Sequence, residues 1–479
     1  MDVKRNFISG RWIGSGNAIE NRNPSNTDEV VGHYSRASYD EAVQAIESAR
    51  AAFPAWSSSG IQQRHDILRT ISDEILRRKE ELGRLLAREE GKTLPEAIGE
   101  VVRAGQVFSF FSGEALRLAG EHIPSTRPGI EVDVTREPVG VVGIITPWNF
   151  PIAIPAWKIA PALAYGNCVV FKPAELVPGS AWALSDIISR AGLPEGVFNL
   201  VMGRGAEVGA ALIDDPRVDA ISFTGSEKTG KLIASACAQQ MKKFQLEMGG
   251  KNPLVILDDA NLDTAIDCAV NGAFFSTGQR CTASSRLVVT ENIHDRFVSG
   301  VIERLKTLTV DDALKPETHI GPVVDQSQFD QNLFYIDTGL KDGAALAWGG
   351  NKLDRETPGF YLEPALFTET HPEMRINQAE IFGPVASVIR VRGYDEALAT
   401  ANATPFGLSA GICTSSLKYA SDFRRRSDAG MVMVNLPTAG VDYHTPFGGR
   451  KRSSYGPREQ GRYAQEFYTT VKTAYTKPV

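Results

Sequence analysis

Apolar residues recur with two different periods along the chain, and each period predicts one type of element. Residues 1–37 combine short alternating stretches with turn residues, which predicts short strands. Ser38 and Glu41 have the spacing of a capping box, so we expect a helix to begin there. From Ile61 to Leu118 apolar residues recur at helical spacing, which predicts three amphipathic helices that cover a sheet face.

Further along, short apolar runs alternate with helical stretches. Val139–Ile145 is apolar nearly throughout, as expected of a strand that is covered on both faces. Strands that alternate with helices indicate βαβ units and a parallel sheet. The pattern restarts at Pro253, so we expect two Rossmann-like α/β domains. The runs expected to form strands are 139–145, 168–171, 197–201, 220–224, 254–257, 286–290, 386–391 and 431–435.

Two other stretches have the character of antiparallel strands. Ile130–Arg136 alternates apolar and polar residues, as a strand with one solvated face does. Residues 466–475, near the C-terminus, also have strand character. We expect the second stretch to pair with the first or with another subunit.

Composition and charge narrow the possible functions. The 479 residues exceed one ordinary core, so we expect two or three domains. The net charge is −6 and the basic residues are scattered, which disfavours nucleic acid or an anionic membrane as a partner. The N-terminus has no apolar leader. The most apolar stretch, 147–171, contains Lys158 and four prolines, which favours packed core over a membrane span.

The cysteines favour a reducing compartment. They are odd in number and include no CxxC pair, so we expect a cytoplasmic protein without a disulfide framework, a cysteine-rich zinc site or another metal centre. The five cysteines are Cys168, Cys237, Cys268, Cys281 and Cys413.

Cys281 differs from the other cysteines in its surroundings. It lies in a loop of small and polar residues, Phe274–Ser285, after an apolar run. A reactive cysteine needs open space because its thiolate must be reachable. Unreactive loop cysteines are also common, so the loop alone leaves both interpretations open.

Polar residues at strand ends offer candidate cofactor contacts. Thr224–Ser226 stands where a buried strand ends and a helix begins, which suits either a phosphate or an ordinary N-cap. Lys172 and Glu175 follow another buried strand, at the sheet edge where ligands bind, although a solvated pair is the alternative. Gly203–Gly209 is one residue too long for GxGxxG, which favours a plain turn.

Two more residues suit catalysis of an oxidation. Asn149 stands between two prolines and has an amide that could hold an oxyanion, or it could satisfy a local turn. Glu247 precedes Gly-Gly in an apparent linker between the two halves, where it could act as a general base or lie in a solvated hinge. None of the seven histidines lies beside these motifs, which disfavours a Cys/His hydrolase.

Seven motifs together resemble those of the aldehyde dehydrogenase superfamily, in the family's order and over essentially the full length. They are PWNFP at 147–151, FKPAE at 171–175, FTGS at 223–226, LEMGGKNP at 246–253, GQRC at 278–281, EIFGP at 380–384 and PFGG at 446–449.

The resemblance implies a mechanism. Cys281 would attack the aldehyde to form a thiohemiacetal, and Asn149 with the backbone N–H of Cys281 would hold the oxyanion. Glu247 would activate water to hydrolyse the thioester that remains after hydride transfer. The cofactor would be NAD, with NADP possible, because Glu175 repels a 2′-phosphate but could swing aside.

The resemblance also implies binding residues and a domain plan. The expected cofactor residues are Thr146, Trp148, Lys172, Glu175, Gly205, Gly209, Thr224, Gly225, Ser226, Met248, Glu380 and Phe382. The expected substrate residues are Phe150, Trp157, Arg280 and Phe447. The implied regions are a dinucleotide-binding domain (1–119 and 139–248), a catalytic domain (249–445) and a β-strand oligomerisation arm (120–138 and 446–479), in a homodimer or homotetramer.

The expected substrate is an aldehyde that bears a carboxylate. Runs such as FFSTGQRCTASSR look like those of the bacterial α-ketoglutaric semialdehyde (2,5-dioxopentanoate) dehydrogenases of sugar-acid catabolism. Arg280 could bind the substrate carboxylate, favour the thiolate or point away. The family's usual KxSGxGRE is KRSSYGPRE here, at 451–459, a change that we expect to alter the loop near the site entrance without touching the chemistry.

Other functions stay open from the sequence. A succinic or glutaric semialdehyde dehydrogenase and a broad-range aldehyde dehydrogenase share all these motifs. A cysteine-dependent esterase would use the same thioester chemistry without a cofactor. A non-catalytic binding protein on this scaffold is disfavoured, because it would not require Cys281, Glu247 and Asn149 together.

Overall fold

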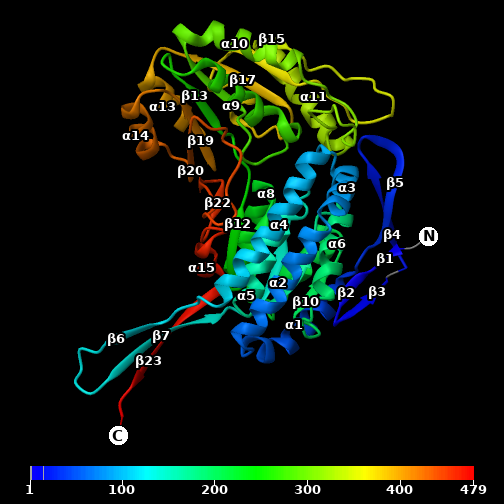
Figure 1. Cartoon of the computed structure of the whole chain (residues 1–479), viewed down its shortest axis with the longest axis vertical. Coiled ribbons are helices and arrows are strands. Elements are labelled where there is room, and N and C mark those ends of the chain that lie inside the picture. The colour runs from blue at the N-terminus through cyan, green and yellow to red at the C-terminus, as the bar shows by residue number, and fades with distance from the viewer. Residues whose placement is uncertain (1–2, 15, 479) are drawn as a thin grey trace.

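Two large sheets, each mainly parallel, form the two α/β halves of the molecule (Figure 1). The computed structural model describes residues 3–14 and 16–478. The expectation of two Rossmann-like parallel sheets is confirmed.

The first sheet has a parallel centre and antiparallel edges. In spatial order its strands are β22 (Ser454–Tyr455), β12 (Lys243–Glu247), β11 (Ala220–Thr224), β8 (Val141–Ile145), β9 (Cys168–Lys172), β10 (Phe198–Leu200), β2 (Asn6–Ile8) and β3 (Arg11–Ile13). The strands from β12 to β10 run parallel, whereas β22, β2 and β3 pair antiparallel. The side chains of β9 are buried throughout, as its apolar run predicted.

Helices surround this first sheet. They are α1 (Tyr39–Ser57), α2 (Ile61–Arg77), α3 (Lys79–Glu90), α4 (Leu94–Ala115), α5 (Ala153–Ala164), α6 (Pro178–Ser189), α7 (Ala210–Asp214) and α8 (Glu227–Gln239), with a π-helical turn, η1 (Gly205–Gly209). The predicted capping box is present at the start of α1: Ser38 Oγ accepts a hydrogen bond from the Glu41 N–H at 3.2 Å, and Glu41 Oε2 accepts one from the Ser38 N–H at 2.8 Å.

The three predicted helices α2, α3 and α4 pack differently from the expectation. They lie mainly against α5 and α6 rather than directly on the sheet. Every residue of α5 is buried, Lys158 included, because α5 lies between α4 and the strands β8 and β9. The helix spacing in the sequence was therefore correct, but the covered surface is helical.

The second sheet is parallel except at one edge. In spatial order its strands are β15 (Ala345–Trp348), β16 (Ala365–Thr370), β17 (Val385–Val391), β14 (Arg286–Thr290), β13 (Pro253–Ile256), β19 (Ser409–Cys413) and β20 (Met431–Val434), with β15 antiparallel. The accompanying helices are α9 (Leu262–Phe274), α10 (Glu291–Lys306), α11 (Gln326–Lys341), α12 (Arg375–Gln378), α13 (Tyr394–Asn402) and α14 (Leu417–Arg426), and a short turn, η2 (Phe275–Gly278), follows α9.

A three-stranded antiparallel arm projects from the first half (Figure 1). It consists of β6 (Glu121–Pro124), β7 (Glu131–Pro138) and β23 (Thr469–Thr476), with β7 in the centre. The C-terminal strand therefore pairs with the Ile130 stretch of its own chain, one of the two expected partners. The elements that lead into β23 are η3 (Arg462–Ala464) and α15 (Gln465–Tyr468).

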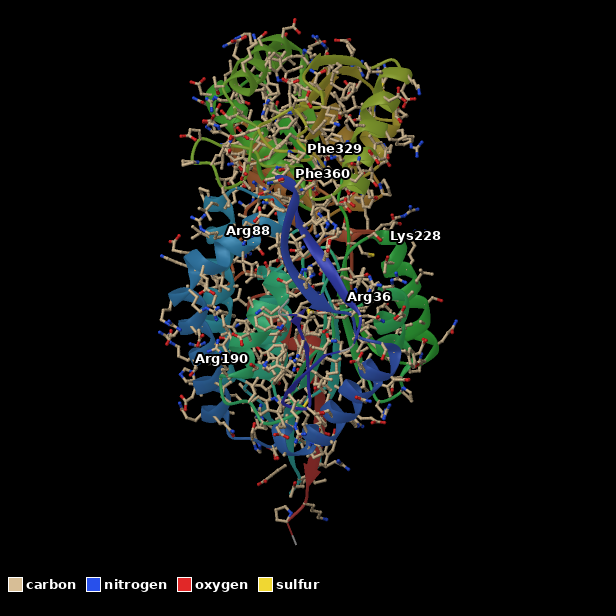
Figure 2. The ribbon with its side chains drawn as sticks, turned by 90° about the vertical axis from the view of Figure 1, so that its right-hand side faces the viewer. Arg36, Arg88, Arg190, Lys228, Phe329 and Phe360 are labelled. Atoms are coloured by element: carbon tan, nitrogen blue, oxygen red, sulfur yellow. The ribbon has the colours of Figure 1, made fainter. Side chains whose placement is uncertain are left out.

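An N-terminal hairpin connects the two halves. Its strands are β4 (Ala18–Asn23) and β5 (Asn26–Ser35), beside the short β1 (Val3–Lys4). At the hairpin tip the Thr27 N–H donates to the Pro358 carbonyl at 2.7 Å, and the Phe360 N–H donates to the Pro24 carbonyl at 3.0 Å. Figure 2 shows this tip beside Phe360, in the second half. A further small pair, β18 (Phe406–Gly407) and β21 (Arg450–Lys451), joins the second half to the C-terminal segment.

Candidate active site

Cys281 lies in the walls of two cavities, each of about 230 Å³, and Ile154 also lines both. The residues that line cavity A are Pro147, Trp148, Asn149, Ile154, Thr224, Gly225, Ser226, Met248, Gly249, Cys281, Gln328, Gln331, Glu380 and Phe382. The residues that line cavity B are Glu96, Arg103, Phe150, Ile154, Trp157, Ser276, Arg280, Cys281, Thr282, Gly440, Val441 and Phe447.

The turn before Cys281 has an unusual backbone. Ser276, Thr277 and Gly278 have φ values of 51°, 57° and 65°, so three successive residues are left-handed. This conformation is unfavourable for a β-branched residue such as Thr277 and persists only where surrounding contacts hold it. Glu96 of α4 supplies such contacts, because its Oε1 accepts hydrogen bonds from the N–H and the hydroxyl of Ser276 at 2.8 and 2.9 Å.

Burial strongly affects the thiol of Cys281. Burial raises its pKa to about 12, and the carboxylates of Glu380 and Glu247 add to the rise by charge repulsion. Cys281 is therefore a neutral thiol at neutral pH in this arrangement, and a base must accept its proton before it can attack. The backbone N–H groups of Cys281 and Thr282 oppose this rise and lower the pKa.

Asn149 connects the nucleophile turn to the first half. Its amide Nδ2 donates to the Gln279 carbonyl at 2.9 Å, so it contacts the Cys281 loop instead of satisfying a local turn. The Asn149 carbonyl in turn accepts a hydrogen bond from the buried Lys92 at 2.6 Å. Lys92 also donates to Glu100 of α4 at 2.7 Å, so Lys92 links the Asn149 loop to that helix.

Glu247 lies at the end of β12, not in a linker as the sequence suggested. Its Oε2 accepts a hydrogen bond from Ser454 Oγ at 2.5 Å. Burial raises the pKa of Glu247 well above its usual range, and the nearby Glu459 adds to this, whereas the Ser454 bond opposes it. The side chain is absent from the walls of both cavities, so the structure shows it turned toward β22.

This contact corrects our expectation for the segment 451–459. Ser454 occupies a position where the family pattern has glycine, and we expected the change to affect loop shape alone. Its hydroxyl instead bonds directly to Glu247, so the change reaches a candidate catalytic group.

Aromatic and acidic side chains shape cavity A. The rings of Trp148 and Phe382 meet edge to face, with centroids 5.3 Å apart. Glu380 accepts a hydrogen bond from the Gly250 N–H at 2.8 Å, and burial raises its pKa to about 7. A Cβ atom at Gly249 would lie 2.0 Å from the Glu380 carboxylate, so this close approach requires glycine.

The start of α8 faces cavity A. Ser226 Oγ accepts a hydrogen bond from the Thr229 N–H at 3.3 Å, so Ser226 is the N-cap of the helix. The N-cap interpretation is therefore confirmed, and the phosphate interpretation stays a prediction, although Thr224, Gly225 and Ser226 also line the cavity. Thr224 Oγ1 is buried without a hydrogen-bond partner among the described residues.

Five of the predicted cofactor residues lie outside the wall of cavity A. Met248 lines cavity A, whereas Thr146, Lys172, Glu175, Gly205 and Gly209 do not. Thr146 and Lys172 are neighbours at the ends of β8 and β9, since the Thr146 N–H donates to the Lys172 carbonyl at 3.3 Å. Glu175 is exposed and accepts a hydrogen bond from the Gly205 N–H at 3.3 Å, at the start of η1, which ends at Gly209.

The four predicted substrate residues all line cavity B. Trp157 and Phe447 lie with their ring centroids 5.6 Å apart, and the Trp157 indole N–H donates to the buried Glu459 at 2.7 Å. Arg280 forms an ion pair with Glu96 at 3.3 Å. The charge of Arg280 therefore already has a partner within the protein.

Several residues of the site were missed in the sequence. Glu96 and Arg103 are on α4, and Gln328 and Gln331 are on α11. Glu96 and Arg103 belong to a region whose periodic pattern we interpreted as structural cover, whereas α11 was not predicted from the sequence, and no local motif marks any of the four residues. These helices line the cavities because of tertiary packing, which a local sequence pattern does not show.

Two properties of the described chain bear on function. Within residues 3–14 and 16–478 no helix is long and apolar enough to cross a membrane. Across the same residues, no cluster of three or more His, Cys, Asp or Glu side chains has the geometry of a metal site.

Comparison with known proteins identifies the family. The aldehyde dehydrogenase family profile matches residues 12–474. The chain is 43% identical to the alpha-ketoglutaric semialdehyde dehydrogenase of Bacillus subtilis, over 99% of this chain and 98% of that protein. It is also 43% identical to the alpha-ketoglutarate semialdehyde dehydrogenase of Haloferax volcanii, with 99% of each chain covered.

A solved structure gives the same result at the level of the fold. Betaine aldehyde dehydrogenase from Staphylococcus aureus, in complex with NAD+, superposes with a TM-score of 0.97 at 36% identity, over 99% of this chain and 95% of that one. With a reachable cysteine between two cavities, and with sequence and fold in agreement, the chain belongs to the aldehyde dehydrogenase family.

Proposed function

We propose that this aldehyde dehydrogenase oxidises α-ketoglutaric semialdehyde to α-ketoglutarate with NAD as the electron acceptor. The observation that carries the proposal is the position of Cys281 between cavity A and cavity B. A nucleophile in the common wall can meet an aldehyde from one side and a dinucleotide from the other. The similarity to two α-ketoglutaric semialdehyde dehydrogenases supports this choice of aldehyde.

Cys281, Asn149 and Glu247 each have a separate role in the proposed reaction. Cys281 gives its proton to solvent water and its sulfur bonds to the aldehyde carbon, while the Asn149 amide and the Cys281 N–H stabilise the oxyanion. A bound NAD supplies the acceptor for the hydride. Glu247 then turns from Ser454 toward the thioester and takes a proton from the water that attacks it. The carboxylic acid leaves and the thiol is restored.

The residues around cavity A fit a dinucleotide. The unpartnered Thr224 hydroxyl and the start of α8 suit a diphosphate, which gains from free N–H groups at a helix N-terminus. Trp148 and Glu380 suit the nicotinamide end, and Lys172 with Glu175 suits the adenosine ribose. Glu175 is exposed, so it favours NAD by charge repulsion and leaves slower use of NADP open.

We also propose the domain plan, assembly and location that the sequence suggested. The cofactor domain would comprise 1–119 and 139–248, the catalytic domain 249–445, and the oligomerisation arm 120–138 and 446–479. Within the last segment, β22 pairs with β12 of the cofactor sheet, so the arm itself begins nearer to β23. The five free cysteines suit the proposed cytoplasmic location, since disulfides are rare in a reducing compartment.

Initial rates with a small aldehyde panel test the proposed function. We expect kcat/KM for α-ketoglutaric semialdehyde to exceed that for hexanal by at least about tenfold, because a charge-assisted contact adds at least this much. Cys281→Ala should abolish NADH production with both aldehydes. Comparable kcat/KM values for the two aldehydes would contradict the proposed substrate, and a succinic or glutaric semialdehyde preference would replace it.

A further inference from the structure

Arg103 of α4 lines cavity B, and nothing in the sequence marked it as a site residue. Its Nη1 donates to the Val441 carbonyl, and its Nη2 donates to Gln460 Oε1 at 2.9 Å. Its Nε is buried and has no hydrogen-bond partner among the described residues. The two bonds hold the guanidinium in place and use only two of its five N–H donors.

The charge of Arg103 is not neutralised by an ion pair in the described chain. Asp442, Glu100 and Cys281 act on it electrostatically, and none of them forms an ion pair with it in the described chain. Arg280, in the same cavity, pairs with Glu96 at 3.3 Å. Of the two arginines in cavity B, Arg103 is therefore the one that still lacks an anionic partner.

The surroundings of Arg103 would strengthen a hydrogen bond to an anionic partner. Its guanidinium carbon lies 5.7 Å from the centre of the Trp157 ring. Phe150 and Phe447 complete an aromatic wall of the same cavity. Charge-assisted hydrogen bonds are stronger where aromatic walls exclude water, and an unpaired buried donor is costly.

We propose that Arg103 is the specificity-determining residue that binds the carboxylate of the aldehyde substrate. The aldehyde carbon would lie at Cys281 and the carboxylate at Arg103, within one cavity. This inference rests on the proposed function, since it requires a substrate with a carboxylate. In this proposal Arg103 binds the substrate carboxylate, a role for which the sequence analysis considered Arg280.

The test compares three variants on two aldehydes of similar length. Arg103→Met removes the charge with little change in volume, Arg103→Lys keeps the charge, and Arg280→Met is the matched control. For each, kcat/KM is measured with α-ketoglutaric semialdehyde and with pentanal. The ratio of the two values is the readout, because a general loss of folded enzyme cancels in it.

We expect Arg103→Met to lower this ratio by about 10- to 100-fold. The loss should fall mainly on KM for the charged substrate, because the carboxylate contact is made equally before and during reaction. Arg103→Lys should recover part of the ratio. Arg280→Met should change the ratio by less than Arg103→Met.

Other outcomes separate the two claims. If the wild-type enzyme prefers the semialdehyde and Arg103→Met keeps that preference, the inference is wrong and the proposed function stands. A larger selective loss in Arg280→Met also overturns the inference. If the wild-type enzyme itself shows no preference over pentanal, the proposed substrate fails, and the inference fails with it.

Discussion

The hydroxyl of Ser454 is one of the groups that lower the pKa of Glu247. Burial and Glu459 favour the neutral carboxylic acid, whereas a hydrogen bond from Ser454 favours the carboxylate. A general base must be ionised to accept a proton from water. The Ser454 side chain on β22 therefore extends the proposed hydrolysis step to lower pH.

We expect Ser454→Ala to shift the ascending limb of the kcat–pH profile to higher pH. Without the hydrogen bond the charged form of Glu247 loses stabilisation, so its pKa rises further. A hydrogen bond to a charged group contributes about 1.5 kcal/mol, which corresponds to a shift of about one pH unit. Steady-state kcat between pH 6 and about 10 measures this shift.

Ser453→Ala provides the control for that experiment. The neighbouring Ser453 hydroxyl accepts a hydrogen bond from the Gly407 N–H at 2.9 Å, and no bond from it to Glu247 is present. The Ser453→Ala profile should keep the wild-type midpoint. An unshifted limb in Ser454→Ala, or a shift to lower pH, would show that Ser454 does not stabilise the charged base.

At the scale of elements, α4 supports the turn that carries the nucleophile. Glu96 bonds to Ser276, and the Thr277 hydroxyl donates to the Gly321 carbonyl at 3.0 Å. A Cβ atom at Gly278 would lie 2.2 Å from the Gly383 carbonyl oxygen, so only glycine fits there. The left-handed turn thus depends on contacts from three distant segments.

We expect Glu96→Ala to lower kcat by about 10- to 100-fold, because a small displacement of Cys281 greatly slows the reaction. Glu96→Gln should lower kcat by less, since the glutamine amide oxygen can still accept a hydrogen bond from the Ser276 N–H. Glu80→Ala, at an exposed position of α3, serves as the control for removing a glutamate. Wild-type kcat in Glu96→Ala would show that the turn holds its shape without this contact.

Several strands followed directly from the sequence, and others did not. The runs at 220–224 and 286–290 match β11 and β14 residue for residue, because both are rich in apolar and β-branched residues. β12, β16 and β19 were not among the predicted runs. Their residues include several polar or small side chains, so their strand character depends on neighbouring strands in the sheet.

The molecule as a whole exposes apolar side chains on its arm. Ile123, Val471 and Tyr475 have 41%, 58% and 62% of their surface exposed. Val471 and Tyr475 lie on the same face of β23, because alternate residues of a strand share a face. A second copy of the chain would cover this face, which supports the proposed homo-oligomer.

We expect the double substitution Val471→Asp and Tyr475→Asp to convert the oligomer into smaller species, because it places charges where apolar contacts are proposed. Sedimentation velocity measures the change. The control is Thr470→Asp with Lys472→Asp, which adds two acidic residues to the opposite face of the strand. Equal sedimentation of the double variant and the wild type would contradict an interface on this face.

The division of the chain into two α/β halves could be predicted because the strand–helix pattern restarts. The site could be predicted in part, since Cys281, Asn149 and Glu247 all lie in local motifs. The roles of Arg103, Glu96 and Ser454 could not be predicted. Each of these residues lies more than 40 positions along the chain from Asn149, Cys281 and Glu247. Contacts of that kind depend on the packed arrangement of the helices and sheets.

The position of Cys281 in two cavity walls also affects the order in which products depart. Cavities A and B share only Ile154 and Cys281, so we expect that a dinucleotide in cavity A would leave cavity B open for the acid to depart first. The next aldehyde could then occupy cavity B before the cofactor is exchanged. Slow exchange of the cofactor would therefore limit turnover without trapping the acid inside the enzyme.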